Sequence, residues 1–174
     1  MYLRILGIIA IFNLGLAATL APALAGLALL GLSLATLLLW LAGWPSGETG
    51  DISTPGNPLE LWAAAFFAVL FVAISIASTW VVSRFGASGV YTLAAIVGVT
   101  DIDPFVLSIA QGSAASLSQA DASIAVLVAT ASNNLLKAAY AVGFAGWRTG
   151  LPGVASLALL SGTAVTLALL FARQ

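Results

Sequence analysis

Two carboxylates stand inside an apolar stretch, in the segment GVTDIDPFVLS at residues 98–108. Asp101 and Asp103 are two of only six acidic residues in the 174-residue chain. Carboxylate oxygens suit hard or monovalent cations such as Mg²⁺, Na⁺ or H⁺. If these side chains lie inside a membrane, inserting them costs about 3 kcal/mol each, so an intramembrane position makes a functional site the default hypothesis.

A second polar group lies in ATASNNLLKAAY, at residues 129–140. Asn133 and Lys137 are four residues apart and share one face of a helix, with Asn134 beside it. Lys137 is the predicted partner of one of the two aspartates, because a buried cation and a buried carboxylate each cost roughly several kcal/mol unless they are paired. The alternative is a structural ion pair, with the asparagines bonding between helices.

The backbone around the aspartates carries the signal of a helix start. Asp103 before Pro104 reads as an N-cap carboxylate followed by a proline at the first helical position. We therefore predict a transmembrane segment broken between Asp101 and the proline, with Ser108 and Gln111 extending the polar face of Asp101. Such a break is tolerated at membrane depth only where protein buries it or water reaches it. The alternative is a short loop at one membrane interface.

The elements that position these residues are predicted to be membrane helices. The chain is 61% hydrophobic and 6% charged, with a mean hydropathy of +1.13. Soluble domains carry about 25% charged residues, so a soluble fold is excluded. Apolar runs of about 18 residues or more recur between glycine- and proline-containing breaks. The fold class is therefore all-α: a polytopic membrane helix bundle in one integral membrane domain, residues 1–174.

Six transmembrane segments are predicted from the positions of the breaks. Pro22 is expected to end the first one, because proline cannot donate to the helix ladder. Asn57 with Glu60, and Ser118 with Asp121, form capping boxes that predict the starts of the third and fifth. The predicted spans cover residues 2–20, 23–43, 58–82, 90–116, 120–147 and 152–171, with an extramembrane loop at 44–57.

Residue types missing from the sequence exclude other chemistry. The chain has no cysteine and no histidine, so it offers neither thiolate nor imidazole ligands. Its net charge of −1 provides no basic patch for nucleic acid. Two aspartates two residues apart on one chain do not face each other as in an aspartic protease, and no enzymatic activity is predicted. Arg4 is expected only to snorkel to the membrane surface.

The predicted function is small-ion transport, with a cation favoured. Asp101 and Asp103 are the predicted ligands of a hard cation, and Lys137 balances their charge. The predicted binding residues are Asp101, Asp103, Ser108, Gln111, Asn133, Asn134 and Lys137. No resident cofactor is predicted, since Mg²⁺, Na⁺ or H⁺ would be the substrate. An anion could instead use Lys137 and the half-helix N-terminus. The alternative function is a regulatory or assembly subunit that acts through helix–helix contacts.

Four short motifs, taken together, resemble a known family. They are Asn57-Pro58-Leu59-Glu60; Arg84, Gly86 and Gly89; Gly98, Asp101 and Asp103; and Ser132, Asn133 and Lys137. They resemble the C-terminal membrane domain catalogued as domain of unknown function 4010, in the MgtC/SapB superfamily. The resemblance covers about residues 1–150. Pro104 departs from the family pattern, which often has alanine there.

The resemblance implies a multi-pass protein of the bacterial or archaeal cytoplasmic membrane, loosely associated with magnesium homeostasis. It brings no established reaction. Family members are commonly longer, with further membrane helices before this region, so the chain looks like a fragment or a short stand-alone version. The predicted partners are the lipid bilayer and either further copies of the chain or a missing N-terminal membrane half. Either would keep the polar helix faces away from lipid.

Overall fold

The computed structural model describes residues 1–42, 61–112 and 117–173, and every regular element in those ranges is a helix. The helices are α1 (Tyr2–Phe12), α2 (Leu14–Ala42), α3 (Leu61–Val97), α4 (Ile102–Ala110) and α5 (Gln119–Phe171). Four helical stretches are long and apolar enough to cross a membrane, at 14–41, 65–97, 119–144 and 150–171. The predicted all-α membrane bundle is confirmed. The predicted loop 44–57 and the helix start at 57–60 lie outside the described residues.

The first break in the chain lies at Asn13, and the predicted boundary at Pro22 is wrong. Pro22 lies inside α2. The Asn13 side-chain oxygen accepts a hydrogen bond from the Leu16 backbone N–H at 3.0 Å, which is the bond of a helix N-cap. The Asn13 cap therefore determines where α2 begins, and Pro22 is accommodated inside the helix. As a result α1 has 11 residues and is about 16 Å long, half of a membrane span.

The chain turns at Gly86, within the residues 83–89 where a turn was predicted. Gly86 has φ 63° and ψ −150°, and this non-helical backbone divides α3 into two arms, 61–85 and 87–97. A positive φ is accessible to glycine because it has no Cβ. The second arm is therefore short, like α1.

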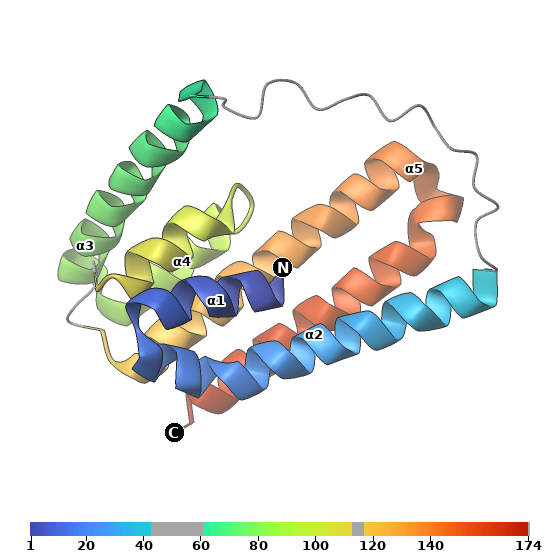
Figure 1. Cartoon of the computed structure of the whole chain (residues 1–174), viewed down its shortest axis with the longest axis horizontal. Coiled ribbons are helices and arrows are strands. Elements are labelled where there is room, and N and C mark those ends of the chain that lie inside the picture. The colour runs from blue at the N-terminus through green and yellow to red at the C-terminus, as the bar shows by residue number, and fades with distance from the viewer. Residues whose placement is uncertain (43–60, 113–116, 174) are drawn as a thin grey trace.

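Helix α5 folds back on itself, as Figure 1 shows. The Ser161 hydroxyl donates to the Ala131 carbonyl at 3.0 Å, so the two arms pack side by side and antiparallel. The arms at 119–144 and 150–171 correspond to the predicted fifth and sixth spans. In the first arm 67% of the most apolar window is buried, against 11% in α2 and in α3. The first arm of α5 is therefore the central helix of the bundle.

The second arm of α3 runs beside this central helix from its start towards its middle. Tyr91 donates its hydroxyl to Asp121, near the start of α5. Seven residues later, the Gly98 carbonyl accepts from the Asn133 side chain at 3.0 Å, farther along α5. The two helices therefore run in the same direction, and the α3 arm ends beside Asn133.

Helix α4 then returns to the side from which the α3 arm came (Figure 1). The end of α4, at Ile109 and Gly112, lines a pocket together with Ser118 and Gln119 at the start of α5. The predicted segment 90–116 is thus broken as expected, but its second half does not continue across the membrane. A capped helix start fixes where a helix begins and leaves its direction open, so the sequence pattern could not reveal this reversal.

Helix α1 is also confined to one half of the bundle. Its first residue, Tyr2, accepts a hydrogen bond from the Asn134 side chain at 3.0 Å. Its far end leads into α2 beside Gln119, whose side chain donates to Thr19. Three short segments, α1, the second arm of α3 and α4, therefore meet about halfway along the first arm of α5. Their packing is apolar, and Ile5, Ile9 and Phe105 are fully buried.

Candidate functional site

The break between α3 and α4, residues 98–101, lies at the level of Asn133. Asn133 follows Gln119 by fourteen residues and precedes Phe144 by eleven. At 1.5 Å per residue, these distances are about 21 Å and about 16 Å. The hydrocarbon core of a bilayer is about 30 Å thick, so a helix that spans it from 119 to 144 carries the break near the middle of the membrane.

Side chains of α5 satisfy the backbone where α3 ends. The last carbonyls of a helix have no partner within it, and in lipid they find no water. The Ser132 hydroxyl donates to the Ala95 carbonyl at 2.6 Å, and the Asn133 amide donates to the Gly98 carbonyl at 3.0 Å. The remaining acceptors are local: Ala94 from Gly98, Ile96 from Val99, and Val97 from Thr100. Every carbonyl from residue 94 to residue 98 therefore has a donor.

Gly98 allows the break to approach α5 this closely. A Cβ atom at this position would lie 2.5 Å from the Ala129 carbonyl oxygen and 2.8 Å from the Ser132 Cβ. Both are shorter than real Cβ contacts, and a backbone carbonyl in a helix cannot move aside. The absence of a side chain at Gly98 is thus what seats the break on the central helix.

Asp101, and not Asp103, is the N-cap of α4. Its carboxylate accepts from the Asp103 backbone N–H at 3.1 Å, and its backbone is extended, with φ −122° and ψ 118°. The predicted cap at Asp103 was wrong by two residues, so Pro104 occupies the third helical position instead of the first. N–H groups in the whole first turn lack an intrahelical acceptor, so proline is tolerated at either position.

The partner of Asp103 is Arg4, and the predicted pairing with Lys137 is not formed. The Arg4 Nη2 lies 2.9 Å from both carboxylate oxygens of Asp103. The Lys137 Nζ instead donates to the Met1 sulfur at 2.9 Å, which is a weak acceptor. The expectation that Arg4 only snorkels is also overturned. The half-length α1 carries Arg4 to the break, an arrangement that no local sequence pattern predicts.

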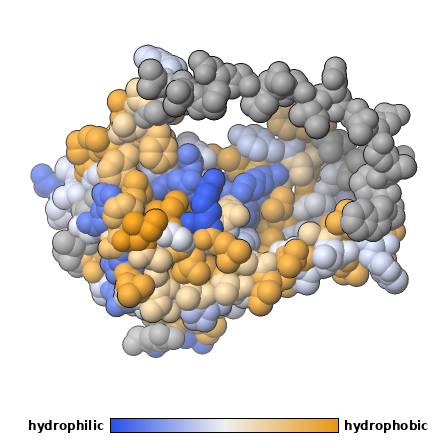
Figure 2. Space-filling model, viewed as in Figure 1, coloured by the Kyte–Doolittle hydropathy of each residue, from blue (hydrophilic) through white to orange (hydrophobic). Residues whose placement is uncertain are grey.

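We call Arg4, Asp101, Asp103 and Lys137 the charged cluster. It contains two positive and two negative side chains, and it is electrically balanced. Arg4, Asp101 and Lys137 are exposed on the chain, whereas Asp103 is 17% exposed. Figure 2 shows hydrophilic residues gathered near the middle of this face, around the start of α1 and along the first arm of α5, between hydrophobic surfaces. The cluster therefore faces away from the packed core.

Comparison with known proteins places this architecture in a family. The family described as Domain of unknown function (DUF4010) matches residues 1–145. The chain belongs to the DUF4010 family. An uncharacterized protein from Aquifex aeolicus (strain VF5) is 34% identical over 109 residues, which cover 62% of this chain and 47% of that protein. The match therefore spans about half the length of this relative. No solved structure matches the chain significantly.

The structure of this DUF4010 chain brings together part of the predicted site. Asp101, Asp103 and Asn133 gather at the break, and Lys137 lies one turn beyond Asn133 on α5. Asn134 is 2% exposed and is held by Tyr2. Within the described residues, no three histidine, cysteine, aspartate or glutamate side chains form a metal-binding group. A metal ion here would need amide or main-chain oxygens in addition to the two carboxylates.

Two predicted residues lie away from the cluster in the DUF4010 fold. Ser108 is fully buried on α4, and its hydroxyl has no hydrogen-bond partner among the described residues. Gln111 is the exposed C-cap at the other end of α4. Seven residues of helix separate Ser108 from Asp101 by about 10 Å along α4, and the burial of Ser108 places its side chain inside the bundle instead of at the break. The predicted polar face that joins Asp101, Ser108 and Gln111 is not seen at the break, because the packing of α4 decides which of its polar residues reach the site.

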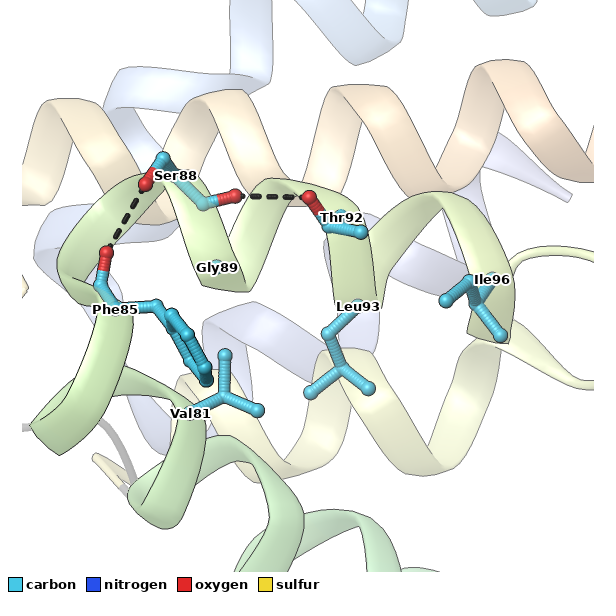
Figure 3. Close-up of a pocket in the computed structure, with 7 residues that line it drawn as sticks. All are labelled: Val81, Phe85, Ser88, Gly89, Thr92, Leu93 and Ile96. Carbon is cyan, nitrogen blue, oxygen red and sulfur yellow. Dashed lines mark hydrogen bonds between the residues drawn. The ribbon is translucent and has the colours of Figure 1, made fainter.

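A pocket of about 370 Å³ lies beside the second arm of α3, and Figure 3 shows its lining. Its two hydroxyls are bound within their own helix: Ser88 donates to the Phe85 carbonyl at 3.0 Å and Thr92 to the Ser88 carbonyl at 3.1 Å. The rest of the lining is aliphatic or aromatic, with no charged residue. This pocket therefore offers no ion-binding chemistry and is separate from the charged cluster.

Proposed function

We propose that this DUF4010 chain moves a small cation across the membrane at the break between α3 and α4. The observation that carries the proposal is the level of the two carboxylates, at the turn of a helical hairpin that ends beside the middle of a spanning helix. Charged side chains at such a depth are costly and mark ion pathways by default. Half-helices that meet near the midplane are also how transporters present backbone ends to ions.

Within this proposal, Asp101 is the first ligand of the ion. Its one hydrogen bond is to the Asp103 backbone N–H, and it makes no ion pair with a described residue. Asp103 supplies the second carboxylate. The amide nitrogen of Asn133 donates to Gly98, and its amide oxygen accepts no hydrogen bond from a described residue. Oxygen ligands of this kind suit Mg²⁺, Na⁺ or H⁺. Mg²⁺ would agree with MgtC/SapB superfamily membership, which the sequence resemblance implies and which forms part of the proposal.

The short helices suggest a route to the site. The segments α1, 87–97 and α4 occupy one half of the bundle only, so the side of the break towards Phe144 is not covered by them. The exposed members of the charged cluster require water or another protein surface there, since lipid cannot solvate them. We propose a water-filled vestibule on that side, in a multi-pass protein of a bacterial or archaeal cytoplasmic membrane that completes its walls with further copies or further helices.

Ion flux into proteoliposomes tests this function. Vesicles loaded with dyes for Mg²⁺, Na⁺ or H⁺ compare the wild-type chain with Asp101→Asn, and Asp121→Asn is the matched control. Asparagine caps helices as well as aspartate does, so Asp101→Asn removes the charge and retains the cap. We expect at least a tenfold loss of flux in Asp101→Asn alone. Equal flux in all three proteins, or no flux of any of these ions, would rule the proposal out.

Two observations favour a second candidate, the regulatory or assembly subunit. Arg4 is 60% exposed, and the chain matches less than half of its longer relative, so the charged face could dock on another membrane protein. That function predicts a partner that co-purifies in mild detergent and is lost in Arg4→Ala, with no flux at any stage. A pure assembly of this chain that conducts ions would exclude it.

A further inference from the structure

The ion pair between Arg4 and Asp103 uses the same atoms that a bound cation would need. The Arg4 Nη2 lies 2.9 Å from each oxygen of the Asp103 carboxylate. A metal ion binds a carboxylate through those oxygens, at 2.0–2.6 Å for Mg²⁺ or Ca²⁺. Arg4 and a metal ion therefore compete for one position, and they cannot hold it together.

Charge balance leads to the same conclusion. With Arg4 and Lys137 present, the two carboxylates are already neutralised, so an added cation would leave a net positive charge near the middle of the membrane. Such a charge is strongly disfavoured in a low-dielectric environment. A monovalent cation can enter without this cost if Arg4 leaves the carboxylates as the ion arrives, and for Mg²⁺ the departure of Arg4 halves the added charge.

Arg4 is able to leave. Its side chain is 60% exposed, and apart from the contact with Asp103 it makes no hydrogen bond or ion pair to a described residue. Arginine has a long flexible stem that can carry its guanidinium to a polar surface. Asp103, at 17% exposed, stays fixed in the first turn of α4. Of the two members of this ion pair, Arg4 is therefore the one that can move away.

We infer that Arg4 is the resident counter-ion of the site, which a metal cation displaces from Asp103 when it binds and which returns to expel it. This inference rests on the proposed cation transport and deepens it in two ways. It names a specificity-determining residue outside the predicted set, and it commits the substrate to a metal cation, Mg²⁺ or Na⁺. Arg4 lowers the affinity for the ion and thereby speeds its release.

Binding to the purified full chain tests the inference. The thermal unfolding midpoint is followed in detergent while MgCl₂ or NaCl replaces choline chloride at constant ionic strength. Arg4→Gln is expected to lower the half-saturating concentration at least about tenfold. Arg4→Lys retains the charge but loses the planar guanidinium, so its half-saturating concentration should lie between those of the wild type and Arg4→Gln. This variant also controls for misfolding of Arg4→Gln. Arg173→Gln is the matched control, because Arg173 is exposed just after the end of α5, outside the charged cluster, and its loss removes an equal charge.

The outcomes separate this inference from the proposed function. Tighter binding in Arg4→Gln, with less than a threefold change in Arg173→Gln, supports it. If the wild-type chain binds Mg²⁺ or Na⁺ and Asp101→Asn abolishes the binding, while Arg4→Gln and Arg173→Gln behave alike, the inference fails and the proposed function stands. If neither ion shifts any of the proteins, the inference fails, and metal-cation transport fails with it.

Discussion

Two acidic sites lie at different levels of the same bundle, one at the start of α5 and one beside its first arm, and their partners differ. Near the start of α5, the Asp121 carboxylate accepts from the hydroxyls of Tyr91 and Ser118, so neutral groups of the chain hold it. At the break, Asp103 is held by the charged Arg4, and Asp101 accepts one backbone N–H. The first arrangement completes a helix start. The second leaves hydrogen-bond acceptors of the Asp101 carboxylate unused, at a level where an unsatisfied charge is costly. This difference separates the candidate binding site at the break from the capping box at Asp121.

The largest expected effect separates the two sites by their activity. Asp101→Asn should reduce cation flux at least tenfold and change the free energy of unfolding by less than about 1 kcal/mol, because asparagine is an equivalent cap. Asp121→Asn should retain flux within threefold. Proteoliposome flux and thermal unfolding on the same preparations measure both quantities. Loss of flux in both variants would mean that Asp121 is needed for transport as much as Asp101, and the proposed difference between the two sites would be wrong.

The next effect concerns the seating of the break on α5. Gly98→Ala should destabilise the protein by about 3 kcal/mol, because the new methyl group meets the Ala129 carbonyl and forces the backbone apart. Gly143→Ala is the control: Gly143 lies inside α5, and nothing lies within 4 Å of its Cβ position. Alanine should be neutral or slightly stabilising there. Similar unfolding midpoints for the two variants would contradict the close approach.

Asn133→Ala should cost about 2 kcal/mol of stability, since it leaves the Gly98 carbonyl without a donor at mid-membrane. Ser161→Ala, which removes a bond to the Ala131 carbonyl inside a continuous helix, should cost about 1 kcal/mol or less. Chemical or thermal unfolding in detergent compares them. A larger loss for Ser161→Ala would show that the break does not depend on α5 for its hydrogen bonds.

The smallest effect is expected at the other site. Tyr91→Phe removes one hydrogen bond to Asp121 while Ser118 still holds that carboxylate, so stability should fall by about 1 kcal/mol. Ion flux should not change. If Tyr91→Phe reduces flux as strongly as Asp101→Asn does, the start of α5 belongs to the pathway, and the contrast between the two sites is lost.

Local signals in the sequence predicted the helices, the turn at Gly86 and the break beside the aspartates. Capping boxes and glycines act over a few residues, and the Ser118–Asp121 box is present as expected. The same kind of signal misled at Pro22, because a proline in a long apolar run does not have to end a helix. Asparagine is a common N-cap residue, so the cap of α2 at Asn13 could have been predicted from the sequence, but it was not.

The site was predicted in part, for a related reason. Residues within one helix, such as Asn133 and Lys137, could be placed on a common face from their spacing. The pairing of Arg4 with Asp103 joins residues 99 positions apart and depends on α1 ending halfway across the bundle. The reversal of α4 is equally non-local. The sequence pattern did not distinguish between these arrangements, and tertiary packing determines which one forms. The partner of Asp103 is therefore Arg4 instead of the expected Lys137.

The most direct test of the central claim asks whether water reaches the break at mid-membrane. The chain has no cysteine, so Val99→Cys introduces a single reporter on a residue that is 48% exposed, and Leu135→Cys, 55% exposed on α5 at a similar level, is its control. A membrane-impermeant thiol reagent applied to intact vesicles should label Val99→Cys from one side only and leave Leu135→Cys unlabelled in lipid. No labelling of Val99→Cys from either side, or equal labelling of both variants, would contradict a hydrated intramembrane site.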